Sequence, residues 1–185
     1  MNSGYRVYGI DLGTTNSSIS YIDEKGNPVI ILDEERDAST PSVVLFENES
    51  NIVVGKYAKL SDLVYPTQTV KNIRDQMGMT TKDGKPTWER EFFGKTYRPE
   101  DISALILRKL AKIAERETGS PVTDVVITVP AYSTIAHHQA TVDAGRIAGL
   151  TVRAILPDPS AAAIAYSHAS QADETILVFD LGGGT

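Results

Sequence analysis

Two short peptides that combine an aspartate with several small residues each follow an apolar run. The first is DLGTTN at residues 11–16, and the second is DLGGGT at residues 180–185. The runs before them, 5–10 and 175–179, have the composition of β-strands, so each strand delivers a carboxylate to its end. Glycines and small hydroxyl residues then let backbone N–H groups approach an anion closely. The pair therefore predicts a clamp that holds a phosphate group from two sides.

The two aspartates of this clamp, Asp11 and Asp180, suit a magnesium ion that accompanies the phosphates. Mg²⁺ keeps several of its waters in proteins and is often held through one or two carboxylates. We therefore expect both aspartates to hold the ion through water. The alternative is a turn in which the aspartate bonds its own loop, which is common for an isolated Asp-x-Gly. Because the motif occurs twice after a strand, the metal role is favoured.

The composition is that of an ordinary globular protein. The 185 residues are 41% hydrophobic and 23% charged with a net charge of −6, which does not suggest a nucleic-acid surface. No long apolar run and no leader-like start occurs, so nothing points to a membrane. The chain has no cysteine, which excludes disulfides, thiol catalysis and cysteine zinc sites. We expect a cytoplasmic protein.

The periodicity of the apolar residues predicts one α/β sheet that positions the first motif. Helices at 133–149 and 159–168 follow the fourth and fifth expected strands. Because parallel strands need helical crossovers, this order implies a mixed five-stranded sheet flanked by helices. The expected strands lie at 5–10, 17–23, 28–32, 125–129 and 151–155.

Residues 38–120 are interpreted as an inserted α+β subdomain. The expected division is a lobe of residues 1–37 and 121–172, this insertion, and the start of a second lobe at 173–185. Pro99 suits the first turn of a helix and Gly119 its end. The expected elements of the insertion are strands at 42–46 and 52–54, helices at 55–64 and 67–77, a hairpin at 89–97 and a helix at 99–119.

Seven stretches of the chain resemble the ATPase domain of DnaK-type heat-shock chaperones, in that family's order. The resemblance implies an actin-like, ribonuclease-H-like fold whose ATP hydrolysis drives a separate peptide-binding domain. It covers about the first half of that ATPase domain, so we expect the fragment alone to be inactive. The stretches are GIDLGTTNS (9–17), TPSVV (40–44), VGKYAK (54–59), PVTDVVITVPAY (121–132), QATVDAGRIAGLTV (139–152), PSAAAIAY (159–166) and DLGGGT (180–185).

The resemblance also implies roles for individual residues. Asp11 and Asp180 match the carboxylates that orient hydrated Mg²⁺. ATP or ADP is the implied ligand, and client peptides, a J-domain co-chaperone and a nucleotide exchange factor are the implied partners. The first phosphate loop would consist of Gly13, Thr14, Thr15 and Asn16, and the second of Gly182, Gly183, Gly184 and Thr185, with Thr185 near the γ-phosphate.

Three positions depart from the family's pattern. Arg74 stands where the family has a lysine that reaches the γ-phosphate, and Lys71 lies one helical turn earlier on roughly the same face. An arginine can brace a phosphate, but its planar head does not replace an ammonium. Asp158 stands for a glutamate that positions metal-bound water, and it is also the expected N-cap of the helix that Pro159 opens. His138 stands for an arginine that relays the nucleotide state.

Three classes of function remain open. The first is the nucleotide-binding lobe of a chaperone ATPase, in which water attacks the γ-phosphate. The second is a sugar or acetate kinase of the same superfamily, and the third is an actin-like filament ATPase. The insertion lacks an obvious acid for deprotonating a substrate hydroxyl, which argues against the kinase. The apolar strand 175–179 lacks a sheet within this chain, so we expect the chain to self-associate through it.

Overall fold

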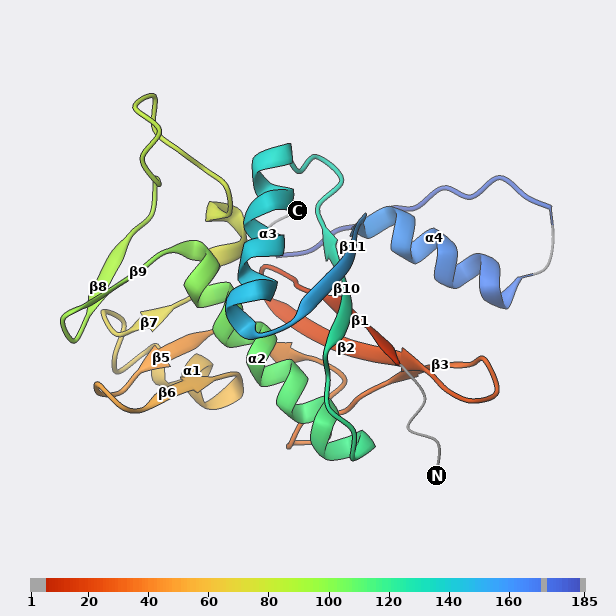
Figure 1. Ribbon diagram of the computed structural model, residues 1–185, viewed down its shortest axis with the longest axis horizontal. Coiled ribbons are helices and arrows are strands. Elements are labelled where there is room, and N and C mark those ends of the chain that lie inside the picture. The colour runs from red at the N-terminus through yellow and green to blue at the C-terminus, as the bar shows by residue number, and fades with distance from the viewer. Residues whose placement is uncertain (1–5, 171–172, 184–185) are drawn as a thin grey trace.

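The structure is a computed structural model that describes residues 6–170 and 173–183. A mixed β-sheet runs through the middle of the molecule (Figure 1). Its strands are β1 (Val7–Asp11), β2 (Asn16–Ile22), β3 (Pro28–Ile30), β4 (Thr40–Pro41), β10 (Asp124–Val129) and β11 (Thr151–Pro157).

The strands of this sheet follow the order β11-β10-β1-β2-β3, and the short β4 pairs with β2. β10 pairs in parallel with both β1 and β11, whereas the β1–β2 and β2–β3 pairs are antiparallel. The prediction of a mixed five-stranded sheet is therefore confirmed, with β4 as an addition. Because β1, β10 and β11 are parallel, their C-terminal ends meet at one edge of the sheet, where open α/β sheets bind ligands.

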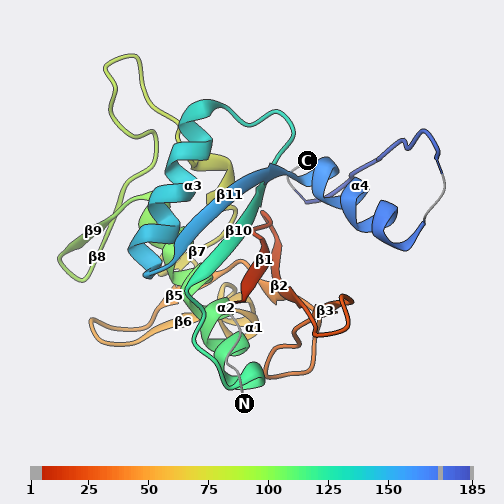
Figure 2. The same ribbon diagram turned by 45° about the vertical axis from the view of Figure 1, so that its right-hand side comes forward.

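Three longer helices accompany the sheet: α2 (Pro99–Thr118), α3 (Ile135–Ala148) and α4 (Asp158–Ala169). Figures 1 and 2 show α2 and α3 side by side on one face, while α4 projects away from them. Alternate residues of β1 and β10 point to that face and share one core with the apolar stripe of α2. None of the helices in the described ranges combines the length and hydropathy that a bilayer-spanning segment requires.

The helix ends show why these segments are helical. α2 begins at Pro99 and ends before Gly119, which has a φ of 64°. Thr134 caps α3 by accepting the backbone N–H of His137 at 3.2 Å. The expected N-cap role of Asp158 is wrong, because this residue is the first within α4 and no side-chain cap forms there. Its carboxylate bonds an arginine instead, as described below.

The residues between β4 and α2 form smaller elements beside the main sheet. β5, β6 and β7 make a sheet in the order β6-β5-β7, and β8 and β9 make the predicted hairpin. Phe92 of the hairpin stacks on Phe46 of β5 with ring centroids 4.0 Å apart. The division of the chain into two lobes and an insertion stays a prediction. The elements are β5 (Val44–Phe46), β6 (Ile52–Val54), α1 (Lys56–Ser61), β7 (Thr69–Val70), the 3₁₀ helix η1 (Ile73–Gln76), β8 (Arg90–Phe92) and β9 (Lys95–Tyr97).

The predicted helix over 67–77 is wrong. The segment contains the two-residue strand β7, which pairs with β5, and the single 3₁₀ turn η1. Asn72 separates the two with a left-handed φ of 56°, which no α-helix tolerates. Strand pairing and the β-branched residues Thr69 and Val70 outweigh the helical spacing that the sequence suggests.

The segment 175–179 was expected to lack a sheet within this chain, and it pairs with no strand among the described residues. The segment lines a shallow cavity of about 460 Å³ with Ala162 and Tyr166 of α4. A strand needs a hydrogen-bonded neighbour, and this segment belongs to none of the described sheets. Leu177 and Phe179 stay exposed.

Candidate functional site

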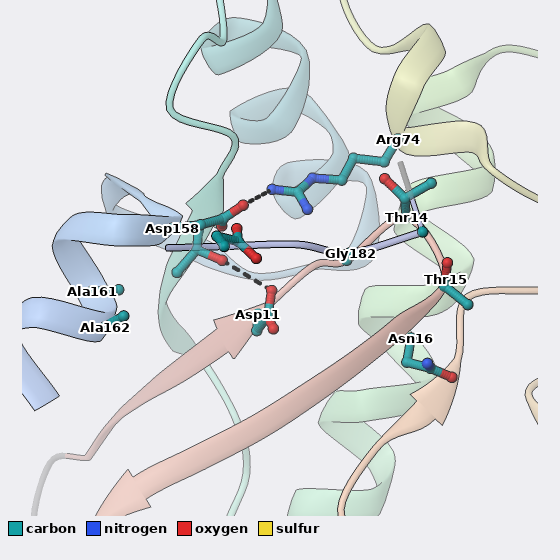
Figure 3. Close-up of a pocket in the computed structure, with 13 residues that line it drawn as sticks. Asp11, Thr14, Thr15, Asn16, Arg74, Asp158, Ala161, Ala162 and Gly182 are labelled. Atoms are coloured by element: carbon teal, nitrogen blue, oxygen red, sulfur yellow. Dashed lines mark hydrogen bonds and ion pairs between the residues drawn. The ribbon is translucent and has the colours of Figure 1, made fainter. Parts of the chain in front are cut away.

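A cavity of about 460 Å³ opens at the C-terminal ends of β1 and β10. Figure 3 shows its walls, which come from segments that are far apart in the sequence. They are the β1–β2 turn, η1, the first turns of α4 and the chain near residue 180. The lining residues are Asp11, Gly13, Thr14, Thr15, Asn16, Arg74, Thr128, Asp158, Ala161, Ala162, Asp180, Gly182 and Gly183.

The turn between β1 and β2 is held rigidly by two buried serines. Ser42 Oγ donates to the carbonyl of Gly13 at 2.7 Å, and the N–H of Gly13 donates to Ser17 Oγ at 3.2 Å. The two serine hydroxyls bond each other at 2.8 Å. A Cβ built on Gly13 would overlap the carbonyl oxygen of Asn16, so only glycine fits this turn. The two threonines that follow Gly13 are thereby fixed at the cavity.

Asp11 ends β1 and its carboxylate opens on the cavity. Thr128 Oγ1, on the neighbouring β10, donates to Asp11 Oδ1 at 3.2 Å. The surrounding protein raises the pKa of Asp11 above its ordinary value, first through burial and next through the charge of Asp158. Asp180 raises this pKa further, against the opposing effects of Thr128 and Arg74. A cation between the carboxylates would relieve their repulsion.

Arg74 and Asp158 form an ion pair at the cavity (Figure 3). Nη2 of Arg74 lies 2.5 Å from Oδ2 of Asp158, and the two side chains are 7% and 15% exposed. The pair joins η1 to the start of α4. Within the described part of the chain, Nε of Arg74 and Oδ1 of Asp158 are buried and lack a hydrogen-bond partner. Buried polar atoms are seldom left unpaired, so the ion pair leaves one donor and one acceptor unsatisfied beside the cavity.

The second motif lies against the first. Asp180, Gly182 and Gly183 line the same cavity as the β1–β2 turn. A Cβ built on Gly183 would overlap Oγ1 of Thr15, so this close approach needs a glycine. The remaining motif residues, 184 and 185, lie outside the described residues. The structure thus brings together both halves of the expected clamp.

Lys71 is not brought to this cavity. Its Nζ lies 2.5 Å from Oδ2 of Asp62, and its side chain is 57% exposed. It lines a neighbouring cavity of about 270 Å³, which shares Thr14 and Thr15 with the first. Because 67–77 is not a helix, Lys71 and Arg74 do not share a face.

Sequence reasoning missed four residues at or beside the cavity. Thr128 lies near the end of β10, and the adjacency of parallel strand ends could have revealed it. Ala161 and Ala162 lie in the first turns of α4, where their small side chains leave the cavity open. Asp75 accepts a hydrogen bond from Thr14 Oγ1 at 3.0 Å. No sequence pattern marks Asp75, because its position depends on the 3₁₀ turn.

The acidic residues of the cavity fit a hydrated divalent cation. Asp11, Asp158 and Asp180 line it together. Within residues 6–170 and 173–183, no three acidic or histidine side chains stand close enough to ligate one ion directly. Mg²⁺ commonly keeps several waters, and carboxylates accept hydrogen bonds from such waters. The residues present therefore suit an ion that is held through water.

Comparisons with known proteins agree with this architecture. The family model described as Hsp70 protein matches residues 7–185. The protein named chaperone protein dnaK3 of Thermosynechococcus vestitus is 45% identical over 197 aligned positions, which cover 97% of this chain and 29% of that protein. The chain therefore spans less than a third of the length of this curated relative. The match includes both Asp-Leu-Gly turns and the segments that line the cavity, and it shows that the chain belongs to the Hsp70 family.

Proposed function

We propose that this chain supplies the phosphate-binding part of a Mg-ATP site in a chaperone ATPase. The observation that carries the proposal is the single cavity on which both Asp-Leu-Gly turns converge with Arg74 and Asp158. Its volume of about 460 Å³ lies within the range of small-ligand sites. The raised pKa of Asp11, caused first by burial and then by Asp158, agrees with a site built for a cation.

The proposed roles follow from the chemistry of each group. Asp11 and Asp180 accept hydrogen bonds from waters of a bound Mg²⁺, whose charge offsets that of the phosphates. Backbone N–H groups of the two turns, at residues 14–15 and 182–183, contact phosphate oxygens. Arg74 meets the charge that develops on the γ-phosphate during attack by water. Asp158 holds Arg74 and offers its unpaired Oδ1 to a water.

Membership in the Hsp70 family supports the wider part of the proposal. We propose that hydrolysis in the full-length protein is coupled to the binding of client peptides by a separate domain. A J-domain co-chaperone and a nucleotide exchange factor would then act on this ATPase domain. The relative that covers nearly the whole chain is itself named a chaperone protein.

Calorimetric titration of the full-length protein with a slowly hydrolysed ATP analogue tests the proposal. Wild type is expected to bind the analogue more tightly with Mg²⁺ than without it. Asp11→Asn should lose most of that gain, about tenfold in Kd or ~1.4 kcal/mol, and should change metal-free binding little. Asp83→Asn, in an exposed turn away from the cavity, serves as the matched control. Equal Mg²⁺ dependence in wild type and Asp11→Asn would contradict the proposal.

Two further assays separate the other classes that share this superfamily. Transfer of radioactive γ-phosphate from ATP to a sugar or to acetate would indicate a kinase. ATP-dependent sedimentation of the full-length protein would indicate a filament protein. The chaperone ATPase is expected to release inorganic phosphate and to give neither result.

A further inference from the structure

We infer that Asp75 is a positioning residue that decides how Thr14 meets a bound ligand. The inference rests on the proposed nucleotide site and adds to it a residue outside both Asp-Leu-Gly motifs. Asp75 does not line the cavity, so it acts on a ligand only through Thr14. Its contact joins η1 to the β1–β2 turn, which are 61 residues apart in the sequence.

The direction of the hydrogen bond between these residues is fixed by chemistry. Thr14 is 6% exposed, and its Oγ1 lies 3.0 Å from Oδ1 of Asp75. An ionised carboxylate can only accept hydrogen bonds. The shared hydrogen therefore belongs to the Thr14 hydroxyl, and it points away from the cavity toward Asp75.

This direction determines what Thr14 can bind. A hydroxyl has one hydrogen and two acceptor lone pairs. With its hydrogen committed to Asp75, Thr14 Oγ1 can only accept a hydrogen bond from the cavity. Phosphate oxygens also only accept, so the Thr14 hydroxyl cannot bond a phosphate oxygen while Asp75 holds it. Thr14 Oγ1 instead accepts a hydrogen bond from a water beside the phosphates.

The neighbouring threonine is free to take the other role. Thr15 also lines the cavity, and its Oγ1 lies beside Gly183 of the second motif. Its hydrogen is available for a phosphate oxygen. The two threonines of the turn therefore have different roles. Thr15 donates a hydrogen bond to phosphate, and Thr14 accepts one from water.

The 3₁₀ turn that carries Asp75 is anchored on several sides. Arg74 bonds Asp158 from the adjacent position. Ile73 is buried beside it, and a Cβ built on Gly78 would clash with the backbone of α3. η1 is therefore fixed between the β1–β2 turn and the start of α4. The Asp75 carboxylate is held in place even though the residue is exposed.

Substitution of Asp75 in the full-length protein tests the inference. Asp75→Ala is expected to slow single-turnover ATP hydrolysis about tenfold and to change the Kd for Mg-ATP less than twofold. Asp75→Asn keeps an acceptor oxygen and should restore most of the rate. Asp83→Ala, another exposed aspartate of the same segment, should behave like wild type. An Asp75→Asn variant as slow as Asp75→Ala, or an unchanged Asp75→Ala, would overturn the inference.

The threonines provide a second comparison. Thr15→Val should weaken Mg-ATP binding about tenfold, because it removes the donor to phosphate. Thr14→Val should mainly slow turnover, because it removes the acceptor that orients water. The opposite pattern would show that Thr14 is the phosphate contact and that Asp75 does not control it.

A stability measurement separates this inference from the proposed function. Thr14→Val, Asp75→Ala and the double variant of the 185-residue chain are compared by urea unfolding. The contact predicts a coupling of about fivefold in the unfolding equilibrium constant, as expected for one net hydrogen bond. Absence of coupling overturns the inference whatever the nucleotide result. Coupling in this chain, together with a full-length protein that binds no Mg-ATP, would support the contact and would contradict the proposed function alone.

Discussion

Arg74 and Lys71 show how much a residue's role depends on its surroundings. Both are cations three positions apart, yet Arg74 is buried at the cavity and Lys71 is exposed beside Asp62. In the full-length protein, Arg74→Ala should reduce turnover about 100-fold, the usual effect of removing a group that stabilises transition-state charge. The Kd for ATP should change far less. Lys71→Ala should reduce turnover only slightly. Single-turnover kinetics and parallel binding titrations measure the turnover and the Kd of both variants.

The comparison of these two variants is informative in either direction. A strong effect of Lys71→Ala with a mild effect of Arg74→Ala would mean that Lys71 moves to the phosphate when nucleotide binds. Lys59→Ala is a matched control, because Lys59 lines the same neighbouring cavity as Lys71 and lies outside the proposed site. Its turnover should equal that of wild type.

The raised pKa of Asp11 predicts how stability depends on pH. The folded state favours the neutral carboxyl, so the stability from this group is complete below the unfolded-state pKa and is lost as pH rises through the folded-state pKa. Asp11→Asn stays neutral and should therefore raise the free energy of unfolding at pH 7 relative to wild type. The difference should shrink toward pH 3. Urea unfolding at several pH values measures it.

The raised pKa of Asp11 has the opposite effect on ligand binding: low pH favours the folded state but weakens the binding of Mg²⁺. A protonated Asp11 cannot accept hydrogen bonds from metal-bound waters on that oxygen, so Mg²⁺-dependent affinity should fall as pH drops through the raised pKa. Asp83→Asn should show neither effect. A destabilised Asp11→Asn at pH 7 would indicate that the bond from Thr128 outweighs burial and repulsion.

The elements of the sheet could be predicted from the sequence because local signals and tertiary contacts agree there. β10 is a buried apolar run, and α3 carries its cap at Thr134 and its stop at Gly149. The segment 67–77 could not be predicted, because its helical spacing competes with a strand pairing to residues more than twenty positions earlier. The contact between Thr14 and Asp75 could not be predicted either, because Asp75 lies in this segment. Both Asp-Leu-Gly turns were visible because their glycines leave a sequence signature.

The packing of α3 on β11 provides a prediction at the scale of elements. A Cβ built on Gly145 of α3 would overlap Cγ2 of Val152. Gly145→Ala should destabilise the chain by about 1–3 kcal/mol through overpacking, although alanine has the better helix propensity. Urea unfolding measures the change, and Gln139→Ala on the exposed side of α3 should stay within about 0.5 kcal/mol of wild type.

A second substitution identifies the cause of that loss. Val152→Ala removes the methyl group that the new side chain would meet. The double variant should therefore recover part of the stability that Gly145→Ala loses, beyond the sum of the single effects. Strictly additive effects would place the strain elsewhere in α3.

At the scale of the molecule, the cavity is only suited to the phosphate part of a nucleotide. Its described lining residues carry carboxylates, hydroxyls, a guanidinium and glycines, with Ala161 and Ala162 as the apolar members. None of these residues is an aromatic or large aliphatic residue that could hold a base. This composition supports our expectation that the 185-residue chain alone binds ATP weakly and does not turn it over.

The exposed apolar residues near the end of the described chain predict self-association. Leu177, Phe179 and Leu181 are 93%, 84% and 79% exposed, although the segment carries no strand pairing. Such a run can pair with an equivalent segment of a second copy, which covers its backbone and its side chains together. Sedimentation equilibrium should therefore give the 185-residue chain a higher molar mass than a version that ends at Ala172. The double variant Leu177→Ser/Phe179→Ser keeps the length of the chain and should be monomeric. If the 185-residue chain, the shortened version and the double variant are all monomeric at equal concentration, the segment stays solvated and the prediction is wrong.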